Sequence, residues 1–262
     1  IQEAVQFHDL ALVITDEQHR FGVKQRSALT EKGDHPHTLV MSATPIPRTL
    51  ALMIYGDLDV SIIDELPPGR HPVETYVVDE RYRARLTAFM DKLIGEGRQV
   101  FVVCPMVEEN DELPGDLKSA EEHAVNVQQL LPHRKVACIH GKMKAKDKEA
   151  IMAAFAAGET DILVATTVIE VGVDVPNAAL MIVENAERFG LSQLHQLRGR
   201  IGRGAFQSYC ILVSDSDTEE AKARLKVMHD TTDGFKIAEA DLRARGPGDF
   251  FGSRQHGLPE MH

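Results

Sequence analysis

The sequence predicts an α/β fold in which helices cover parallel strands. Short apolar runs of strand length recur along the 262 residues, and in the second half they alternate with helix-like segments. Ala, Leu, Val and Ile carry most of the 43% hydrophobic content, while aromatic residues make up only 5% and Trp is absent, as is usual for buried parallel strands. This composition disfavours an all-β sandwich. The length predicts one large or two medium domains.

The first part of the chain predicts an incomplete α/β unit. Leu66-Pro67-Pro68-Gly69-Arg70 breaks every regular pattern, so we place a domain boundary there and assign residues 1–66 to a first domain. Within it we expect strands at 10–15, 38–41 and 60–63 and a helix at 22–32.

The second part, residues 67–213, predicts a closed three-layer unit with one parallel sheet, because strands alternate with helices. Strands are expected at 73–78, 100–104, 136–139, 162–165, 180–183 and 209–213, and helices at 120–131, 146–156 and 192–197. Residues 214–262 then predict a helical hairpin over 218–229 and 237–243, followed by an extended loop rich in Gly and Pro.

The net charge and the cysteine content place only loose limits on the function. The net charge of −11 argues mildly against a polyanionic partner, but basic residues gather at 142–148 and 198–203 and can override the global sign. Cys104, Cys138 and Cys210 lie in apolar runs, which indicates core thiols in a reducing cytoplasm. No apolar stretch approaches the length of a membrane span, and Ile1 begins in the middle of a pattern, as in a truncated chain.

Polar residues follow three of the expected strands. Asp16 and Glu17 come directly after residues 10–15, where an Asp can hold Mg²⁺ beside nucleotide phosphates and a Glu can orient water. Taken alone, such a pair is more often a surface turn. Ser42-Ala43-Thr44-Pro45 follows the next strand, and Thr166-Thr167 follows residues 162–165.

A stronger signal is the run from Gln196 to Gly204, which has three arginines and three glycines in nine positions. The planar guanidinium fork of Arg suits phosphate, and glycines let the backbone approach a ligand closely. The alternative for this run is a solvated basic turn.

In this order, DEQH, SAT, TTVIEVGVDVP and QLRGRIGRG resemble motifs II, III, V and VI of superfamily-2 helicases. The intervening segments DEQHRFGVKQR, IDELPPGR, HGKMK and RARGPGDFFGSRQHG are similar to the RecG family, ATP-dependent DNA helicases that remodel branched DNA in recombination and repair. This resemblance covers essentially the whole chain. It implies RecA-like motor domains, one partial and one complete, with ATP and Mg²⁺ as cofactors and branched or double-stranded DNA as partner.

The resemblance also implies roles for individual residues. In the nucleotide cleft, Asp16 would coordinate Mg²⁺, Glu17 would activate water, and Gln196, Arg200 and Arg203 would reach the γ-phosphate, with Gln18, His19 and Asp174 also at the nucleotide. DNA contacts would come from His140, Thr166, Thr167, Arg245 and Arg254. Coupling of nucleotide state to movement would involve Ser42, Thr44, Arg224 and Gln255.

One departure from the family pattern is large. No G-x-x-x-x-G-K-[ST] phosphate loop occurs in the 262 residues, so the lysine and amides that cradle nucleotide phosphates are absent from this sequence. The family places that loop, and a wedge domain, upstream in what is expected to be a monomeric protein. Two alternatives stay open: the motor of a transcription-repair coupling factor, and a non-catalytic DNA-binding or interaction module.

Overall fold

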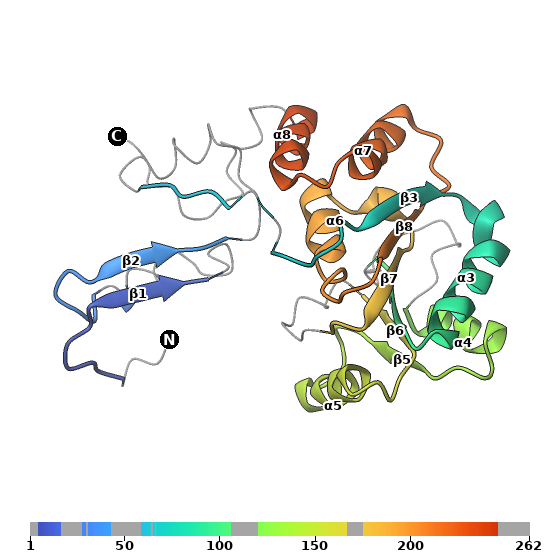
Figure 1. Ribbon diagram of the computed structural model, residues 1–262, viewed down its shortest axis with the longest axis horizontal. Helices are drawn as coiled ribbons and strands as arrows, with labels where there is room; N and C mark the ends of the chain where they lie inside the picture. The colour runs from blue at the N-terminus through green and yellow to red at the C-terminus, as the bar shows by residue number, and fades with distance from the viewer. Residues whose placement is uncertain are drawn as a thin grey trace.

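The computed structural model describes residues 5–16, 28–29, 31–42, 59–63, 65, 67–105, 120–166 and 175–245, and their strands form two separate sheets (Figure 1). The first sheet pairs β1 (Leu12–Thr15) with β2 (His37–Val40) in parallel. The second has six strands in the order β3-β8-β7-β4-β6-β5, and every neighbouring pair is parallel. Its strands are β3 (Glu74–Val78), β4 (Gln99–Val103), β5 (Val136–Ile139), β6 (Ile162–Ala165), β7 (Ala178–Val183) and β8 (Tyr209–Val213).

The two-stranded sheet is only partly covered. Leu12 and Ile14 are about half exposed, at 52% and 53%, whereas Val13 between them is buried. The strand expected at 60–63 was wrong: these residues form no strand, and the Ile63 side chain is 90% exposed. A short apolar run becomes a strand only when another strand accepts its hydrogen bonds, and none pairs with it in the described part of the chain. Most of the helix expected at 22–32 lies outside the described residues.

Helices cover both faces of the six-stranded sheet, which confirms the predicted three layers. One face packs against α3 (Arg83–Gly95) and α4 (Ala120–Leu130). The opposite face packs against α5 (Ala145–Ala156), α6 (Leu191–Arg198), α7 (Glu219–Asp230) and α8 (Gly234–Arg245). Short 3₁₀ turns, η2 (Glu80–Tyr82) and η4 (Ala186–Arg188), precede α3 and α6. None of the helices in these described segments is long and apolar enough to cross a bilayer.

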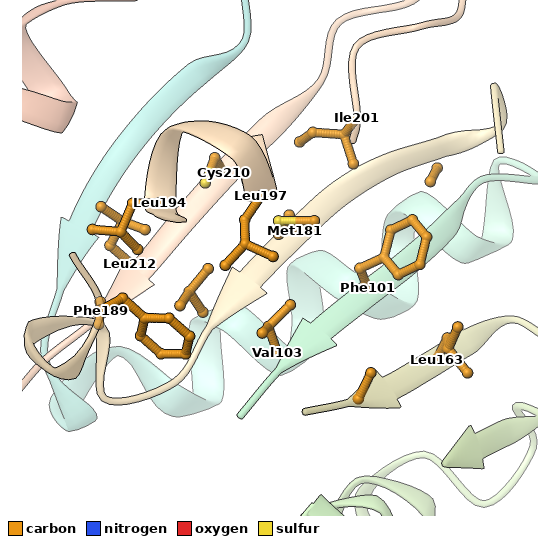
Figure 2. Packing of buried hydrophobic residues seen from close by; sticks show 14 of the residues in the cluster. Phe101, Val103, Leu163, Met181, Phe189, Leu194, Leu197, Ile201, Cys210 and Leu212 are labelled. Carbon is orange, nitrogen blue, oxygen red and sulfur yellow. The ribbon is translucent and has the colours of Figure 1, made fainter. Parts of the chain in front are cut away.

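The larger core lies between the sheet and α5 to α8. Phe101, Leu163 and Met181 of the sheet belong to this core together with Leu194 and Leu197 of α6 (Figure 2). The hairpin contributes to this core through three buried side chains, Leu225, Met228 and Ile237. Since the hairpin and the sheet share one apolar core, movement of the hairpin away from α6 would expose that core to water.

Helix α3 was not among the predicted elements, although its sequence carries a readable pattern. Leu86, Met90, Leu93 and Ile94 recur at helical spacing and are all buried against the sheet. Gly97, at φ +81, ends the helix: its N–H donates to the Ile94 carbonyl and the Arg98 N–H to the Leu93 carbonyl, which is a Schellman motif.

The three cysteines are free thiols, as predicted for core residues. Cys104 and Cys210 are buried, while Cys138 on β5 is half-buried. Burial raises the pKa of Cys138 to about 11 and that of Cys210 to about 12, so both thiols are protonated near neutral pH.

A buried carboxylate at the end of β7 fixes α3 and α4 to the sheet. Both oxygens of Glu184 accept hydrogen bonds from Arg83, at 2.6 and 2.8 Å, and Nε2 of His123 lies 3.3 Å from Oε1. Burial acts to raise the pKa of Glu184, but hydrogen bonds from Arg83 and His123 outweigh it and lower the pKa to about 2. The sequence pattern missed this network, which joins three segments far apart in the chain.

Because the pKa of Glu184 is lower in the folded chain than its ordinary value of 4.5, its stabilising contribution is present above about pH 4.5 and is lost as the pH falls towards 2. We expect Glu184→Gln to lower the free energy of unfolding at pH 7 by about 3 kcal/mol, since Arg83 loses its buried anion. The variant should also lose less stability than the wild type between pH 5 and pH 2, in urea titrations at each pH. The exposed Glu159→Gln should retain the wild-type pH dependence; an identical acid profile for Glu184→Gln would contradict the assignment.

Candidate functional site

The two-stranded sheet brings two predicted site residues to one edge. Thr15 of β1 is level with Val40 of β2, and the N–H of Met41 donates to the Thr15 carbonyl at 2.8 Å. Asp16 and Ser42 therefore both follow carboxyl ends of parallel strands, where α/β sheets bind ligands. The neighbouring predicted residues Glu17, Gln18, His19 and Thr44 lie outside the described residues.

The six-stranded sheet places His140 and Thr166 side by side at its own carboxyl edge. Ile139 of β5 is level with Ala165 of β6, and the Thr166 N–H donates to the Ile139 carbonyl at 3.2 Å. The Thr166 hydroxyl is buried and has no hydrogen-bond partner among the described residues. A buried hydroxyl without a partner is costly, so this one is suited to a ligand or to a neighbouring segment.

A basic turn follows His140 at the same edge. Lys142, Lys144 and Lys146 are exposed, and Nζ of Lys148 donates to the Gly141 carbonyl at 2.8 Å. The turn leads into the amino terminus of α5, where N–H groups and the helix dipole favour an anion. Nε2 of His140 lies 2.9 Å from a Glu121 carboxylate oxygen, so the imidazole already has an acidic neighbour. The predicted residues Thr167 and Asp174 lie outside the described part of the chain.

Helix α6 orients the arginine-rich run. Leu191, Leu194 and Leu197 point into the core, and the Gln193 side chain accepts a hydrogen bond from the Gly190 N–H at the start of the helix. Gln196 is half-buried on the same helix. The position of the helix is therefore set by apolar packing.

Arg198 is separated from the other arginines of the run by its burial. It is only 3% exposed, and its Nη1 donates to the carbonyls of Met228 at 2.8 Å and Thr231 at 3.0 Å and to the Thr75 hydroxyl at 3.3 Å. Two of these acceptors are carbonyls at the end of α7, where a helix leaves its last carbonyls without N–H partners from the helix itself. A cation placed there stabilises them. Arg198, which was not among the residues assigned to the γ-phosphate, therefore joins α6 to the hairpin and to β3.

His195 completes the surroundings of this guanidinium. Burial, and next the charge of Arg198, lower the pKa of His195 to about 4, so its ring is neutral near pH 7. Its Nδ1 can then accept the hydrogen bond from Nη2 of Arg198, over 3.3 Å.

The other two arginines lie on the loop after α6, residues 199–207, which we call the arginine loop. Arg200 and Arg203 are half-buried, and Nε of Arg203 donates to the Gly199 carbonyl at 3.3 Å. Gly202 adopts φ +74 in this loop, a conformation that side chains rarely tolerate. The loop lies near the amino ends of the strands, because Gly202 contacts the segment before β3 and Gly204 the segment before β7.

The predicted coupling residue Arg224 on α7 contacts η4. Its guanidinium donates to the Glu187 backbone carbonyl, while Arg224 Nε and Glu187 Oε2 are buried without partners in the described structure. A second link, 3.2 Å between Ser192 Oγ and Asp241 Oδ2, joins α6 to α8. Arg245 ends α8, and Arg254 and Gln255 lie outside the described residues.

Two family models match the chain. Residues 84–205 match the helicase conserved C-terminal domain, and residues 231–260 match domain 3, C-terminal, of ATP-dependent DNA helicase RecG. The chain is 55% identical to ATP-dependent DNA helicase RecG of Synechocystis, and the matched region spans 100% of this chain and 31% of that protein. It is 54% identical to RecG of Escherichia coli K12, covering 99% of this chain and 38% of that protein. The chain thus spans about a third of the length of these relatives.

The chain is also similar to solved structures of helicases. The structure of RecG bound to a three-way DNA junction aligns with a TM-score of 0.78 and 48% identity, over 99% of this chain and 33% of that one. The helicase Lhr of Mycobacterium smegmatis, bound to ssDNA and AMP-PNP, aligns with a TM-score of 0.60 and 17% identity over 85% of this chain and 31% of that one, which shows the shared fold.

The structural role of Arg198 can be tested on the chain itself. We expect Arg198→Met, which keeps most of the side-chain volume, to lower the free energy of unfolding by about 2 kcal/mol, because the Met228 and Thr231 carbonyls stay buried without a donor. Urea unfolding followed by circular dichroism would measure this. Arg188→Met, at an exposed position of the same region, should change stability little; equal stabilities of the two variants would show that Arg198 is not an anchor.

Proposed function

We propose that this chain belongs to the RecG family of helicases and forms part of an ATP-dependent double-stranded DNA translocase that remodels branched DNA in recombination and repair. The observation that best supports the proposal is the arginine loop, held on a packed helix within a chain 48% identical to a RecG bound to a DNA junction. In this proposal residues 1–66 belong to a first motor domain, 67–213 form the second, and 214–262 form the translocation hairpin and loop.

The nucleotide would bind between the two motor domains. Asp16 at the end of β1 fits a Mg²⁺ ion bound to nucleotide, because Mg²⁺ takes one or two carboxylates and completes its shell with phosphate oxygens and water. When bound, the ion would neutralise charge on the phosphates. Glu17 would orient the attacking water, and Gln18, His19 and Asp174 would contact the nucleotide.

Arg200 and Arg203 would complete the site from the second domain, with Gln196 beside them. Phosphoryl transfer spreads negative charge over the γ-phosphate oxygens, and an arginine placed there accelerates the step by stabilising that charge. Arg suits this role because its fork binds two oxygens and stays charged. Hydrolysis would remove this attraction and let the domains separate, with Ser42, Thr44, Arg224 and Gln255 coupling the change to movement.

DNA would lie along the carboxyl edge of the six-stranded sheet. Thr166, whose hydroxyl has no hydrogen-bond partner among the described residues, lies there beside His140 and the basic turn at 142–148. Thr167, Arg245 and Arg254 would extend this surface. A translocase must accept any base sequence, so these groups would contact phosphates, and affinity for DNA would fall steeply with salt.

The arginine assignment predicts a large effect on catalysis. In the full-length protein, Arg203→Ala should lower DNA-stimulated ATP hydrolysis by about 10³-fold, because the transition state loses a charged partner. Phosphate release with a forked DNA substrate would measure the rate. Arg85→Ala, at an exposed position of α3, should leave the rate near wild type; wild-type hydrolysis by Arg203→Ala would disprove the assignment.

The missing phosphate loop predicts that the 262-residue chain by itself is nearly inactive. Without the lysine and amides of that loop, nucleotide phosphates lose their main binding groups. We expect ATP hydrolysis at the background level, with or without DNA, and only weak DNA binding in a fluorescence anisotropy titration. Robust DNA-stimulated hydrolysis by the purified chain would contradict this.

A further inference from the structure

The segment that leads into the six-stranded sheet packs directly against the arginine loop. The space that a side chain on Gly202 would need is already filled, because an added Cβ would lie 2.7 Å from Cγ2 of Val73. Nε2 of Gln207 donates to the Pro72 carbonyl at 2.9 Å, and the Glu74 N–H donates to the Ser208 carbonyl at 3.0 Å. Residues 71–73, which we call the linker end, therefore run along the arginine loop.

The opposite side of the loop is also held. An added Cβ on Gly204 would lie 2.7 Å from the Pro176 carbonyl oxygen, and Phe206 stacks under the Arg98 guanidinium at 3.8 Å from the ring centroid. Arg98 in turn lies 3.3 Å from the Asn177 side-chain oxygen. On this side the loop rests on residues that directly precede β4 and β7. The linker end, in contrast, leads away to the first sheet.

The geometry points to Val73 and Pro72 of the linker end as positioning residues for Arg200 and Arg203. This inference rests on the proposed function, because it concerns the arginines assigned there to the γ-phosphate. The chain between the two sheets passes through the turn at Pro67–Arg70 and then reaches the loop at Val73 and Gly202. A displacement of the linker end would therefore reach the loop that carries the arginines.

A small displacement is sufficient for a kinetic effect. A misplacement of about 1 Å at a catalytic group can cost about a hundredfold in rate, because phosphoryl transfer depends on placement of charge. The Cγ2 methyl group of Val73 occupies the space that Gly202 leaves by having no Cβ. Its removal leaves a gap into which the loop can relax, away from the position in which Arg203 meets the nucleotide.

The test uses the full-length protein with three variants. Val73→Ala removes the contact with Gly202, Gln207→Ala removes the hydrogen bond to Pro72, and Val77→Ala is a matched control at an exposed position of the adjoining strand β3. We expect Val73→Ala to lower kcat for DNA-stimulated ATP hydrolysis about tenfold and Gln207→Ala about threefold, with KM for ATP and the Kd for a forked DNA nearly unchanged. Val77→Ala should keep the wild-type kcat. Thermal unfolding confirms that each variant is folded at the assay temperature.

A double-mutant cycle separates positioning from general damage. In a background that carries both Arg200→Ala and Arg203→Ala, Val73→Ala should have little further effect on the single-turnover rate, because both groups that it positions are gone. An equal tenfold loss in both backgrounds, or no loss from Val73→Ala and Gln207→Ala in the wild type, would overturn the inference. Failure of the proposed function looks different: Arg203→Ala itself would then hydrolyse ATP at the wild-type rate.

Discussion

The parallel direction of all six strands in the larger sheet is the constraint on which the rest of the structure depends. Each connection must cross from one end of the sheet to the other, and the crossing helices bury both faces. All residues of β4, β6 and β7 are buried as a result. The positions of this unit that a ligand can reach are thereby the two ends of the strands and the outer sides of the helices.

This restriction separates the polar groups of the carboxyl edge from the arginines of the arginine loop. Strand ends place His140 and Thr166 at the carboxyl edge, beside the basic turn, whereas α6 runs back along the sheet and delivers Arg200 and Arg203 near the amino ends. In the proposed translocase, DNA and nucleotide would then contact different parts of one rigid unit. Such an arrangement would let a change at the nucleotide move the edge proposed to contact DNA as a body, without distortion of the sheet.

Buried charges in this fold join elements instead of binding ligands. Glu184 accepts from Arg83 and lies beside His123, and Arg198 closes the end of α7 with no carboxylate among its partners in the described part of the chain. In both cases a charge removed from water is compensated by several hydrogen bonds. Arg198 also ties the arginine-bearing helix to the hairpin, so α6, α7 and α8 are held together by polar contacts as well as by their shared core.

The sequence by itself determined the fold class, most strands and helices and the motifs, because strand and helix periodicity, Gly and Pro breaks and short motifs are local signals. Helix α3 was readable from Leu86, Met90 and Leu93 but was missed, and the strand at 60–63 failed because strand formation needs a partner elsewhere in the chain. Only the tertiary structure decided which arginines of one run are buried. Arg198 and Arg200 differ by two positions, yet only Arg198 meets the end of α7 and the hydroxyl of Thr75. Such contacts join residues about 30 and 123 positions apart, and no local pattern records what a side chain will meet across that separation.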